Sequence, residues 1–176
     1  MPIIRPYGAS APRLHPSVFA AEGSVVAGDV EIGEGSSLWF GTIVRGDVNS
    51  IRIGARTNLQ DQTVVHVTGG THPTVIGDDV TVGHRVVLHG CTVKDRCLIG
   101  IGAIVMDGAV VGPDAMVGAG ALVPPGAIVP PGTLALGSPA RTKRPLTPEE
   151  LAFLPRSAER YVGYAATYVR EGWGAR

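Results

Sequence analysis

Aliphatic residues recur at every sixth position along most of the chain, and many of them are followed directly by glycine. A unit of six residues is too short for a helix with its turn, but it fits one short strand and one corner, where glycine supplies the tight turn. The pattern therefore predicts an all-β solenoid in which three units close one coil and successive coils pair as parallel strands about 4.8 Å apart. The repeating aliphatic positions are Val26, Ile32, Leu38, Val44, Ile53, Leu59, Val65, Ile76, Val82, Leu88, Val93, Ile99, Val105, Val111, Val117, Val123 and Val129, or nearly six coils.

The register of the repeat breaks three times, and each break predicts a loop or a tightened corner. Three extra residues lie between Val44 and Ile53, and five lie between Val65 and Ile76, where the loop TGGTHP stands; the step from Leu88 to Val93 is one residue short. Long insertions in a solenoid are expected at its corners.

The repeat also suggests how the chain is divided. We expect an N-terminal segment at 1–16, the β-helix at 17–136, a connector at 137–146 and a helical segment at 147–172 that packs on the β-helix. Thr147 is the expected N-cap, with Pro148 at the first helical position and Glu150 at the third. We expect Pro155 to divide this segment into a short helical turn and a longer helix.

Composition and charge narrow the function. Fifteen basic residues balance fifteen acidic ones, without a basic stripe, so we expect no nucleic-acid partner. Gly, Asp and Pro interrupt every apolar stretch before it could span a membrane or serve as a signal peptide, so we expect a cytoplasmic protein. The two cysteines, Cys91 and Cys97, are expected to be reduced and buried.

When the repeat units are counted in threes, so that each set of three makes one coil, polar residues fall into two columns. Arg45, His66 and His89 each follow the inward aliphatic residue of one face, in adjacent coils. Two imidazoles one coil apart can bind one metal ion at roughly 2.0–2.1 Å each. Asp61 and His84 are likewise one coil apart, but on another face.

His84 is therefore expected to point away from His66 and His89 within one chain. A symmetric oligomer could bring His84 of one subunit to the pair of the next. Three histidines with an open fourth position are typical of a catalytic zinc site, although imidazole also suits Fe²⁺ and Co²⁺. Single surface histidines are usually only solvated, which is what we expect of His15 and His72.

The segments VRGDVNSIRIGARTNLQDQTVVHV and IGDDVTVGHRVVLHGCTVKDRCLIGIGAIVMDGAVV resemble the γ-class carbonic anhydrases. The resemblance covers nearly the whole chain from about Pro12. It implies a left-handed parallel β-helix, whereas the usual crossover rule alone would favour a right-handed coil. It also implies a homotrimer with metal sites at the subunit interfaces, where Zn²⁺ supports the reversible hydration of CO₂ to bicarbonate.

The resemblance assigns roles to individual residues. His66 and His89 of one subunit and His84 of its neighbour would bind the metal. Arg45 would pair with Asp47 or Asp61 across the interface; an ordinary surface ion pair with Asp47 is the alternative. The other implied site residues are Gln60, which would hydrogen-bond the hydroxide or bicarbonate, and Tyr161, with Tyr164 as a weaker candidate, which would reach toward the site from the C-terminal helix.

The sequence departs from the most active members of that family at the expected proton shuttle. Val48 stands where those members carry a glutamate after Arg-Gly-Asp, and the loop at 68–74 contains no acid. This departure leaves three alternatives: slow activity, a different proton carrier such as His72, or no activity.

Other functions stay open. LALGSPARTKR resembles a segment that hexapeptide acyltransferases use near coenzyme A, but those enzymes need one catalytic histidine and no metal. A thioesterase acting on a coenzyme A thioester with the same metal site is a closer alternative. A non-catalytic trimeric structural subunit is the third.

Overall fold

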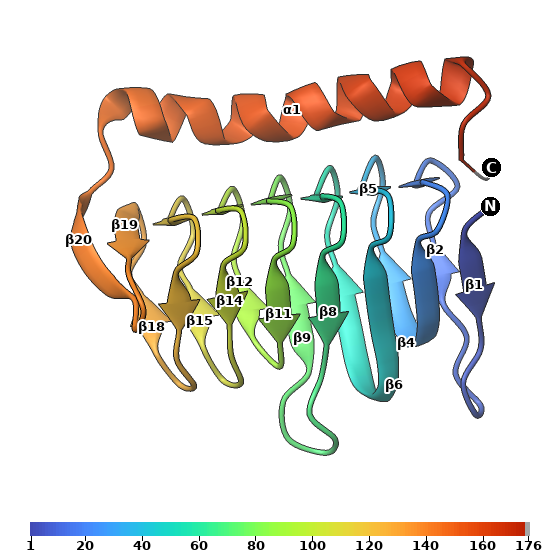
Figure 1. The fold of residues 1–176 in the computed structure, drawn as a ribbon, viewed down its shortest axis with the longest axis horizontal. Helices are drawn as coiled ribbons and strands as arrows, with labels where there is room; N and C mark the ends of the chain where they lie inside the picture. The colour runs from blue at the N-terminus through green and yellow to red at the C-terminus, as the bar shows by residue number, and fades with distance from the viewer. Residues whose placement is uncertain (175–176) are drawn as a thin grey trace.

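The computed structural model describes residues 1–174 and folds them into a parallel β-solenoid flanked by one long helix (Figure 1). The strands are β1 (Ile3–Arg5), β2 (Arg13–Leu14), β3 (Phe19–Ala20), β4 (Val25–Ile32), β5 (Ser37–Leu38), β6 (Ile43–Ile53), β7 (Asn58–Leu59), β8 (Val64–His66), β9 (Thr74–Ile76), β10 (Thr81–Val82), β11 (Val87–His89), β12 (Thr92–Val93), β13 (Leu98–Ile99), β14 (Ile104–Val105), β15 (Val110–Val111), β16 (Met116–Val117), β17 (Leu122–Val123), β18 (Ile128–Val129), β19 (Thr133–Leu136) and β20 (Arg141–Pro145). The helix is α1 (Pro148–Arg170). This is the fold class that the hexapeptide pattern predicts.

The strands stack into three columns, one on each face of the solenoid. Face one contains β6, β8, β11, β14 and β17; face two contains β6, β9, β12, β15 and β18; face three contains β3, β5, β7, β10, β13, β16 and β19. The long strand β6 belongs to two faces because its start pairs with β8 and its end pairs with β9. All neighbouring strands pair in parallel except β19 and β20, which form an antiparallel hairpin.

The solenoid extends further toward the N-terminus than the repeat predicts. Strands β1 and β2 both pair in parallel with β4. The structure therefore has about 7 turns instead of nearly six. Ile4 and Leu14 continue the inward positions, since they pair with Val26 and Ile32. Leu14 packs against the core, whereas Ile4 in the first strand is 39% exposed.

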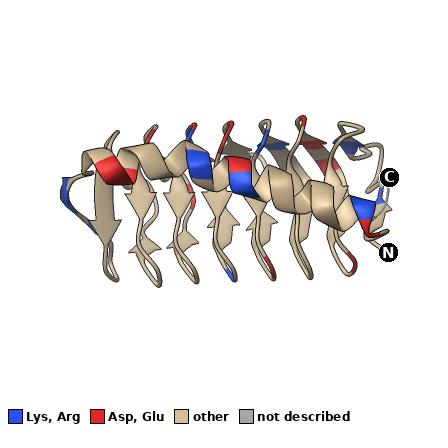
Figure 2. Ribbon diagram, turned by 90° about the horizontal axis from the view of Figure 1, so that it is seen from above, with Lys and Arg blue, Asp and Glu red and all other residues tan. Residues whose placement is uncertain are grey.

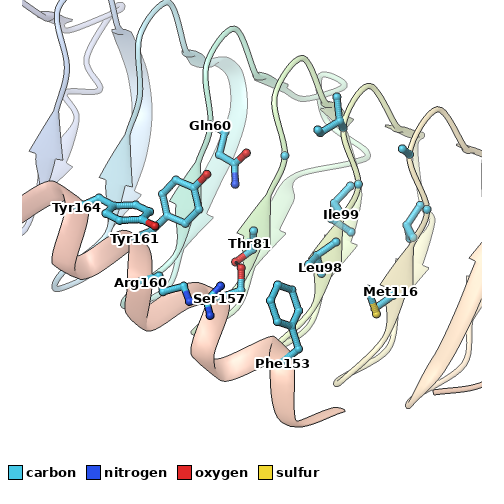
Figure 3. A pocket seen from close by; sticks show the side chains of 16 residues that line it. Gln60, Thr81, Leu98, Ile99, Met116, Phe153, Ser157, Arg160, Tyr161 and Tyr164 are labelled. Carbon is cyan, nitrogen blue, oxygen red and sulfur yellow. Dashed lines mark hydrogen bonds between the residues drawn. The ribbon is translucent and has the colours of Figure 1, made fainter. Parts of the chain in front are cut away.

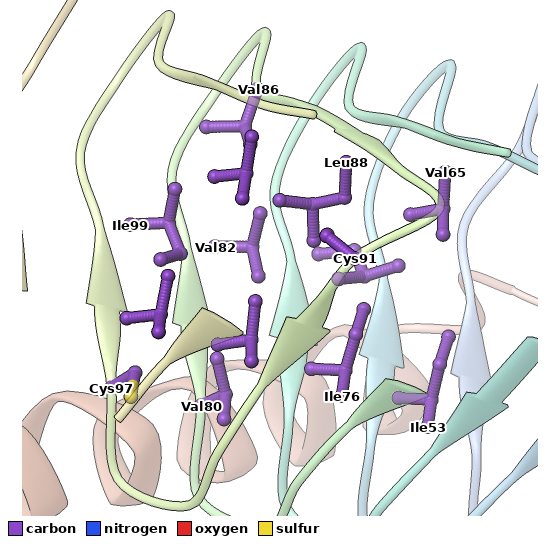
Figure 4. Close-up of a cluster of buried hydrophobic side chains, with 14 of the residues drawn as sticks. Ile53, Val65, Ile76, Val80, Val82, Val86, Leu88, Cys91, Cys97 and Ile99 are labelled. Atoms are coloured by element: carbon purple, nitrogen blue, oxygen red, sulfur yellow. The ribbon is translucent and has the colours of Figure 1, made fainter. Parts of the chain in front are cut away.

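The core consists of the predicted inward aliphatic residues, which stack coil upon coil (Figure 4). Leu88, Val82 and Ile99 are fully buried. Cys91 and Cys97 are buried free thiols, as predicted, and burial raises the pKa of each to about 12. Such thiols do not form thiolates at neutral pH, so they are inert core residues.

Several inward residues are followed by a glycine that the close approach of the next coil requires. A Cβ atom on Gly100 would lie 2.5 Å from the backbone nitrogen of Ala119 and 2.7 Å from the carbonyl carbon of Gly118, both in the next coil. Gly33, Gly54 and Gly83 meet the next coil in the same way. The glycines thus let successive coils stack closely at two corners, after face two at Gly33 and Gly54 and after face three at Gly83 and Gly100.

Helix α1 is one continuous helix that runs along the solenoid toward its N-terminal end (Figure 1). Thr147 and Glu150 form the predicted capping box. The predicted division at Pro155 is wrong, because Pro155 lies inside the helix. The proline removes only one hydrogen bond, to the carbonyl of Leu151. Leu151 is exposed, so water can satisfy that carbonyl.

The helix packs against face three, where it contacts β3, β5, β7 and β10. Its aromatic side chains join those of the first coils: the rings of Tyr161 and Tyr168 lie 5.5 and 5.2 Å from the ring of Trp39. This cluster fixes Tyr161 beside face three.

Within residues 1–174, no helix has the length and apolar character to cross a membrane. Figure 2 shows positions of Lys and Arg interspersed with positions of Asp and Glu along the helix and the corners of the solenoid.

Candidate metal centre

His66 and His89 face each other on face one of the solenoid. They are direct partners in the β8–β11 ladder, so they lie in adjacent coils. The Nδ1 atom of His66 lies 3.1 Å from Nε2 of His89, and the ring centroids are 5.0 Å apart. The predicted stacking of these two histidines is confirmed.

The other ring nitrogen of His66 contacts a carboxylate. Nε2 of His66 lies 3.0 Å from Oδ1 of Asp47, whose Oδ2 accepts a hydrogen bond from Arg45 at 2.5 Å. Burial opposes ionisation of Asp47, but the hydrogen bonds from Arg45 and His66 outweigh it and hold the pKa of Asp47 below its ordinary value. Within one chain, Arg45 therefore pairs with Asp47.

His89 has a carboxylate partner that the sequence reasoning missed. Nδ1 of His89 lies 2.6 Å from Oδ1 of Asp107, which belongs to the following coil. Hydrogen bonds from His89 and from Thr68 lower the pKa of Asp107. The signal was available: Asp107 follows His89 by 18 positions, which is one coil.

His84 lies at a corner of the solenoid, between β10 of face three and β11 of face one. Its Nδ1 lies 2.7 Å from Oδ2 of Asp61, which confirms the predicted stacking of this pair. The His84 side chain is 44% exposed. Its Nε2 is thus the nitrogen left for another ligand.

Gln60 and Tyr161 line a groove of about 530 Å³ between α1 and face three (Figure 3). Gln60 is only 5% exposed, and its Nε2 donates to Asn58 at 3.2 Å. Burial raises the pKa of the Tyr161 hydroxyl, and the negative charge of Asp61 adds to the increase. Tyr164 lies at the same end of the groove, whereas Leu98, Met116 and Phe153 make the other end apolar.

The site residues therefore fall into two groups within one chain. The first half-site consists of Arg45, Asp47, His66 and His89 on face one. The second half-site consists of Gln60, Asp61, His84 and Tyr161, around the corner and the groove of face three.

Neither half-site alone completes a metal centre. Among the described residues, no group of three or more His, Cys, Asp and Glu side chains within one chain could hold a metal ion. The donor set of the first half-site nevertheless fits a shared metal. Two nitrogens bound to one tetrahedral zinc ion at about 2.0–2.1 Å lie about 3.3 Å apart, close to the observed 3.1 Å.

The remaining histidines lie outside both half-sites. Nδ1 of His15 contacts the hydroxyl of Ser17 at 2.8 Å. His72 lies in the loop between β8 and β9, where Nδ1 contacts Thr71 at 2.9 Å. Val48 is 51% exposed and brings no titratable group to the first half-site.

Comparison with known proteins identifies the family of the chain. The chain is 46% identical over 160 residues to the protein named carbonic anhydrase of Geobacillus kaustophilus, covering 91% of this chain and 87% of that protein. It is 48% identical over 166 residues to "Gamma carbonic anhydrase 1, mitochondrial" of Arabidopsis thaliana. The chain belongs to the γ-class carbonic anhydrase family. Residues 90–125 also match the repeat family described as "Bacterial transferase hexapeptide (six repeats)".

The matches differ in coverage and in the activity that their names give. The Arabidopsis match covers 92% of this chain but only 60% of the plant protein. A solved structure of a Bacillus cereus protein named as an acetyltransferase has a TM-score of 0.93 and 44% identity, covering 95% of this chain and 96% of that one. The relatives matched by sequence are thus named carbonic anhydrases, whereas this solved structure carries the name of an acetyltransferase.

Proposed function

We propose that this protein is a metal-dependent enzyme that hydrates CO₂ reversibly to bicarbonate, acting as a homotrimer with a metal site at each subunit interface. The observation that carries the proposal is the 3.1 Å separation of two imidazole nitrogens, His66 Nδ1 and His89 Nε2, on an outward face. Unprotonated imidazole nitrogens that face each other need an ion or a proton between them. A metal ion bound between the two nitrogens would satisfy both of them, and the carboxylates of Asp47 and Asp107 would hold the two rings in place.

The third ligand in this proposal is His84 of a neighbouring subunit. His84 Nδ1 contacts Asp61, so Nε2 is directed to bind the metal. Face one also carries a row of outward aliphatic side chains beside the histidine pair, which a second subunit would cover. These side chains are Ile43, Val64, Val87, Ile104 and Leu122.

Zn²⁺ is the proposed metal, with Fe²⁺ and Co²⁺ as alternatives that suit the same ligands. When bound, the metal lowers the pKa of its coordinated water to near 7, so that hydroxide is available at neutral pH. Asp47, Asp61 and Asp107 each hold one histidine ring, so that the other ring nitrogen faces the metal. Arg45 keeps Asp47 ionised by donating to its carboxylate.

Gln60 and Tyr161 are proposed to hold the substrate. The Nε2 of Gln60 already donates to Asn58, so the amide is fixed in orientation and its second N–H remains for a bicarbonate oxygen. The raised pKa of Tyr161 keeps its hydroxyl protonated and able to donate. Proton release lacks the acidic groups of the most active relatives, so we expect slow turnover, with His72 as the candidate carrier.

One observation favours a second function. The groove of about 530 Å³ beside Gln60 is much larger than CO₂ requires, and much of its lining is apolar. An acyltransferase, or a thioesterase that cleaves a coenzyme A thioester, could place an acyl chain there. A non-catalytic structural trimer is the remaining alternative.

The test measures zinc content and the CO₂ hydration rate of the purified protein after reconstitution with Zn²⁺, Fe²⁺ or Co²⁺. We expect about one metal ion per chain and hydration above the uncatalysed rate, both lost in His89→Ala, whereas the surface variant His15→Ala keeps both. A trimer that binds no metal, or that binds metal without hydrating CO₂, would contradict the proposal. Hydrolysis of acyl-coenzyme A by the same preparation would favour the thioesterase.

A further inference from the structure

The five-residue insertion between β8 and β9 contacts the residue behind His89. This loop protrudes from the solenoid beyond the neighbouring corners (Figure 1). The Oγ1 of Thr68, at its start, donates to Oδ2 of Asp107 at 2.8 Å. The other oxygen of the same carboxylate contacts His89 Nδ1 at 2.6 Å. Asp107 therefore links the inserted loop to one of the two facing histidines.

The loop is held so that Thr68 stays in this position. Thr68 and His72 form an antiparallel bridge, with Thr68 N donating to His72 O at 3.0 Å and His72 N donating to Thr68 O at 3.2 Å. The carbonyl of Thr68 also accepts a hydrogen bond from Nδ2 of Asn49 at 3.0 Å. Thr68 is thus fixed by the loop and by β6.

The backbone next to His89 leaves room for this arrangement. Gly90 has a positive φ of 56°, and a Cβ atom there would lie under 3.0 Å from both Oδ1 of Asp107 and Cβ of His72. A larger residue would displace the carboxylate from the His89 ring. The absence of a side chain at Gly90 therefore allows Asp107 and the inserted loop to pack beside His89.

The carboxylate also determines the chemistry of the ring. A carboxylate only accepts hydrogen bonds, so the Nδ1 of His89 must carry the proton that lies between them. The lone pair then resides on Nε2, the atom that faces His66. Outer carboxylates of this kind fix both the tautomer and the orientation of metal-binding histidines.

We propose that Asp107, held by Thr68 of the inserted loop, is a positioning residue that presents Nε2 of His89 to the metal, and that the loop acts as its clamp. The inference rests on the proposed metal site and adds a role for a loop that has no acidic shuttle residue.

The first experiment measures zinc affinity of the full-length trimer by competition with a chromophoric chelator. Asp107→Ala is expected to bind zinc 10–100-fold more weakly, which is the usual effect of losing an outer carboxylate. Thr68→Val should weaken binding by a smaller factor, and Thr68→Ser should restore it because serine keeps the hydroxyl. The matched control is Asp95→Ala, which removes a carboxylate that accepts only the amide of Asp78 at 3.0 Å.

The second experiment reads the His89 tautomer by nitrogen-15 NMR of the metal-free protein. We expect a proton on Nδ1 in the wild type and a mixture of tautomers in Asp107→Ala. Wild-type zinc affinity in both Asp107→Ala and Thr68→Val would overturn the inference, as would an unchanged tautomer. If the wild type itself binds no zinc, the proposed function fails, and the tautomer measurement still decides whether Asp107 positions His89.

Discussion

Each of the three candidate metal ligands has one ring nitrogen against an aspartate. His66 contacts Asp47, His84 contacts Asp61 and His89 contacts Asp107. A carboxylate behind an imidazole raises its basicity and fixes which nitrogen stays available. Three such pairs within one short chain support the proposal that the rings act as metal ligands, because a solvated surface histidine needs no oriented partner.

The ion pair between Glu150 and Arg144 predicts how the stability of the fold depends on pH. The guanidinium of Arg144 beside Glu150 holds the pKa of that carboxyl at about 2, below its ordinary value of 4.5. Since the folded pKa is depressed, the ion pair stabilises the fold above pH 4.5 and loses this effect as the pH falls through about 2. Glu150→Gln should therefore lower the melting temperature at pH 7, and the difference from the wild type should shrink steadily below pH 4.5.

Thermal unfolding at several pH values checks this expectation. Glu159→Gln is the control, because Glu159 is an exposed carboxylate of the same helix that forms no ion pair within residues 1–174. A difference between Glu150→Gln and the wild type that stays constant down to pH 2 would contradict the assigned ion pair.

The sequence predicts the stacked histidines because a strict repeat converts spacing into position. His66 and His89 fall in register once the five-residue insertion is removed, and so do Asp61 and His84. Asp107 has the same regular spacing but escaped notice, since its role depends on a contact with Thr68 across an irregular loop. Whether Arg45 also pairs across an interface stays a prediction.

At the scale of the element, close stacking of the coils depends on glycines that leave no room for a side chain. Gly100 meets the backbone of the next coil, whereas Gly163 lies exposed within α1 with no atom near its missing Cβ. A change from glycine to alanine should therefore destabilise the fold at position 100 and stabilise it at position 163.

Gly100→Ala is expected to lower the free energy of unfolding by about 1–3 kcal/mol, because the methyl group must push the adjacent coil away. Gly163→Ala should raise it by about 1 kcal/mol, the usual gain from alanine in a helix. Melting temperatures should shift by about 2–4 °C per kcal/mol, in opposite directions. Equal shifts of the same sign would contradict the close approach of the coils at Gly100.

The elements that the sequence predicts best are those that the aliphatic repeat or a capping motif marks directly. Thr147 begins the helix as predicted because its capping box is local. Pro155 misled the prediction, because packing of the buried Leu154 and Ala158 outweighs one lost hydrogen bond. Strands β1 and β2 lie outside the recognised repeat because Ile4 and Leu14 are ten residues apart and Ala20 stands between Leu14 and Val26 in place of a larger aliphatic residue.

At the scale of the whole molecule, the proposed site is divided between two faces of one chain. His66 and His89 lie on face one, and His84 lies at the corner beside face three. A rotational assembly of three identical chains can bring the first half-site of each to the second half-site of the next. We therefore expect the metal site to exist only between subunits.

The most direct measurement of this claim mixes subunits of His66→Ala with subunits of His84→Ala and determines bound zinc. Each variant alone lacks one ligand at every site and should bind little zinc. Every mixed trimer should regain one complete site, where an intact histidine pair meets an intact His84, so random mixing should restore about one quarter of the wild-type zinc. Confirmed mixed trimers that bind no more zinc than the separate variants would contradict a site shared between subunits.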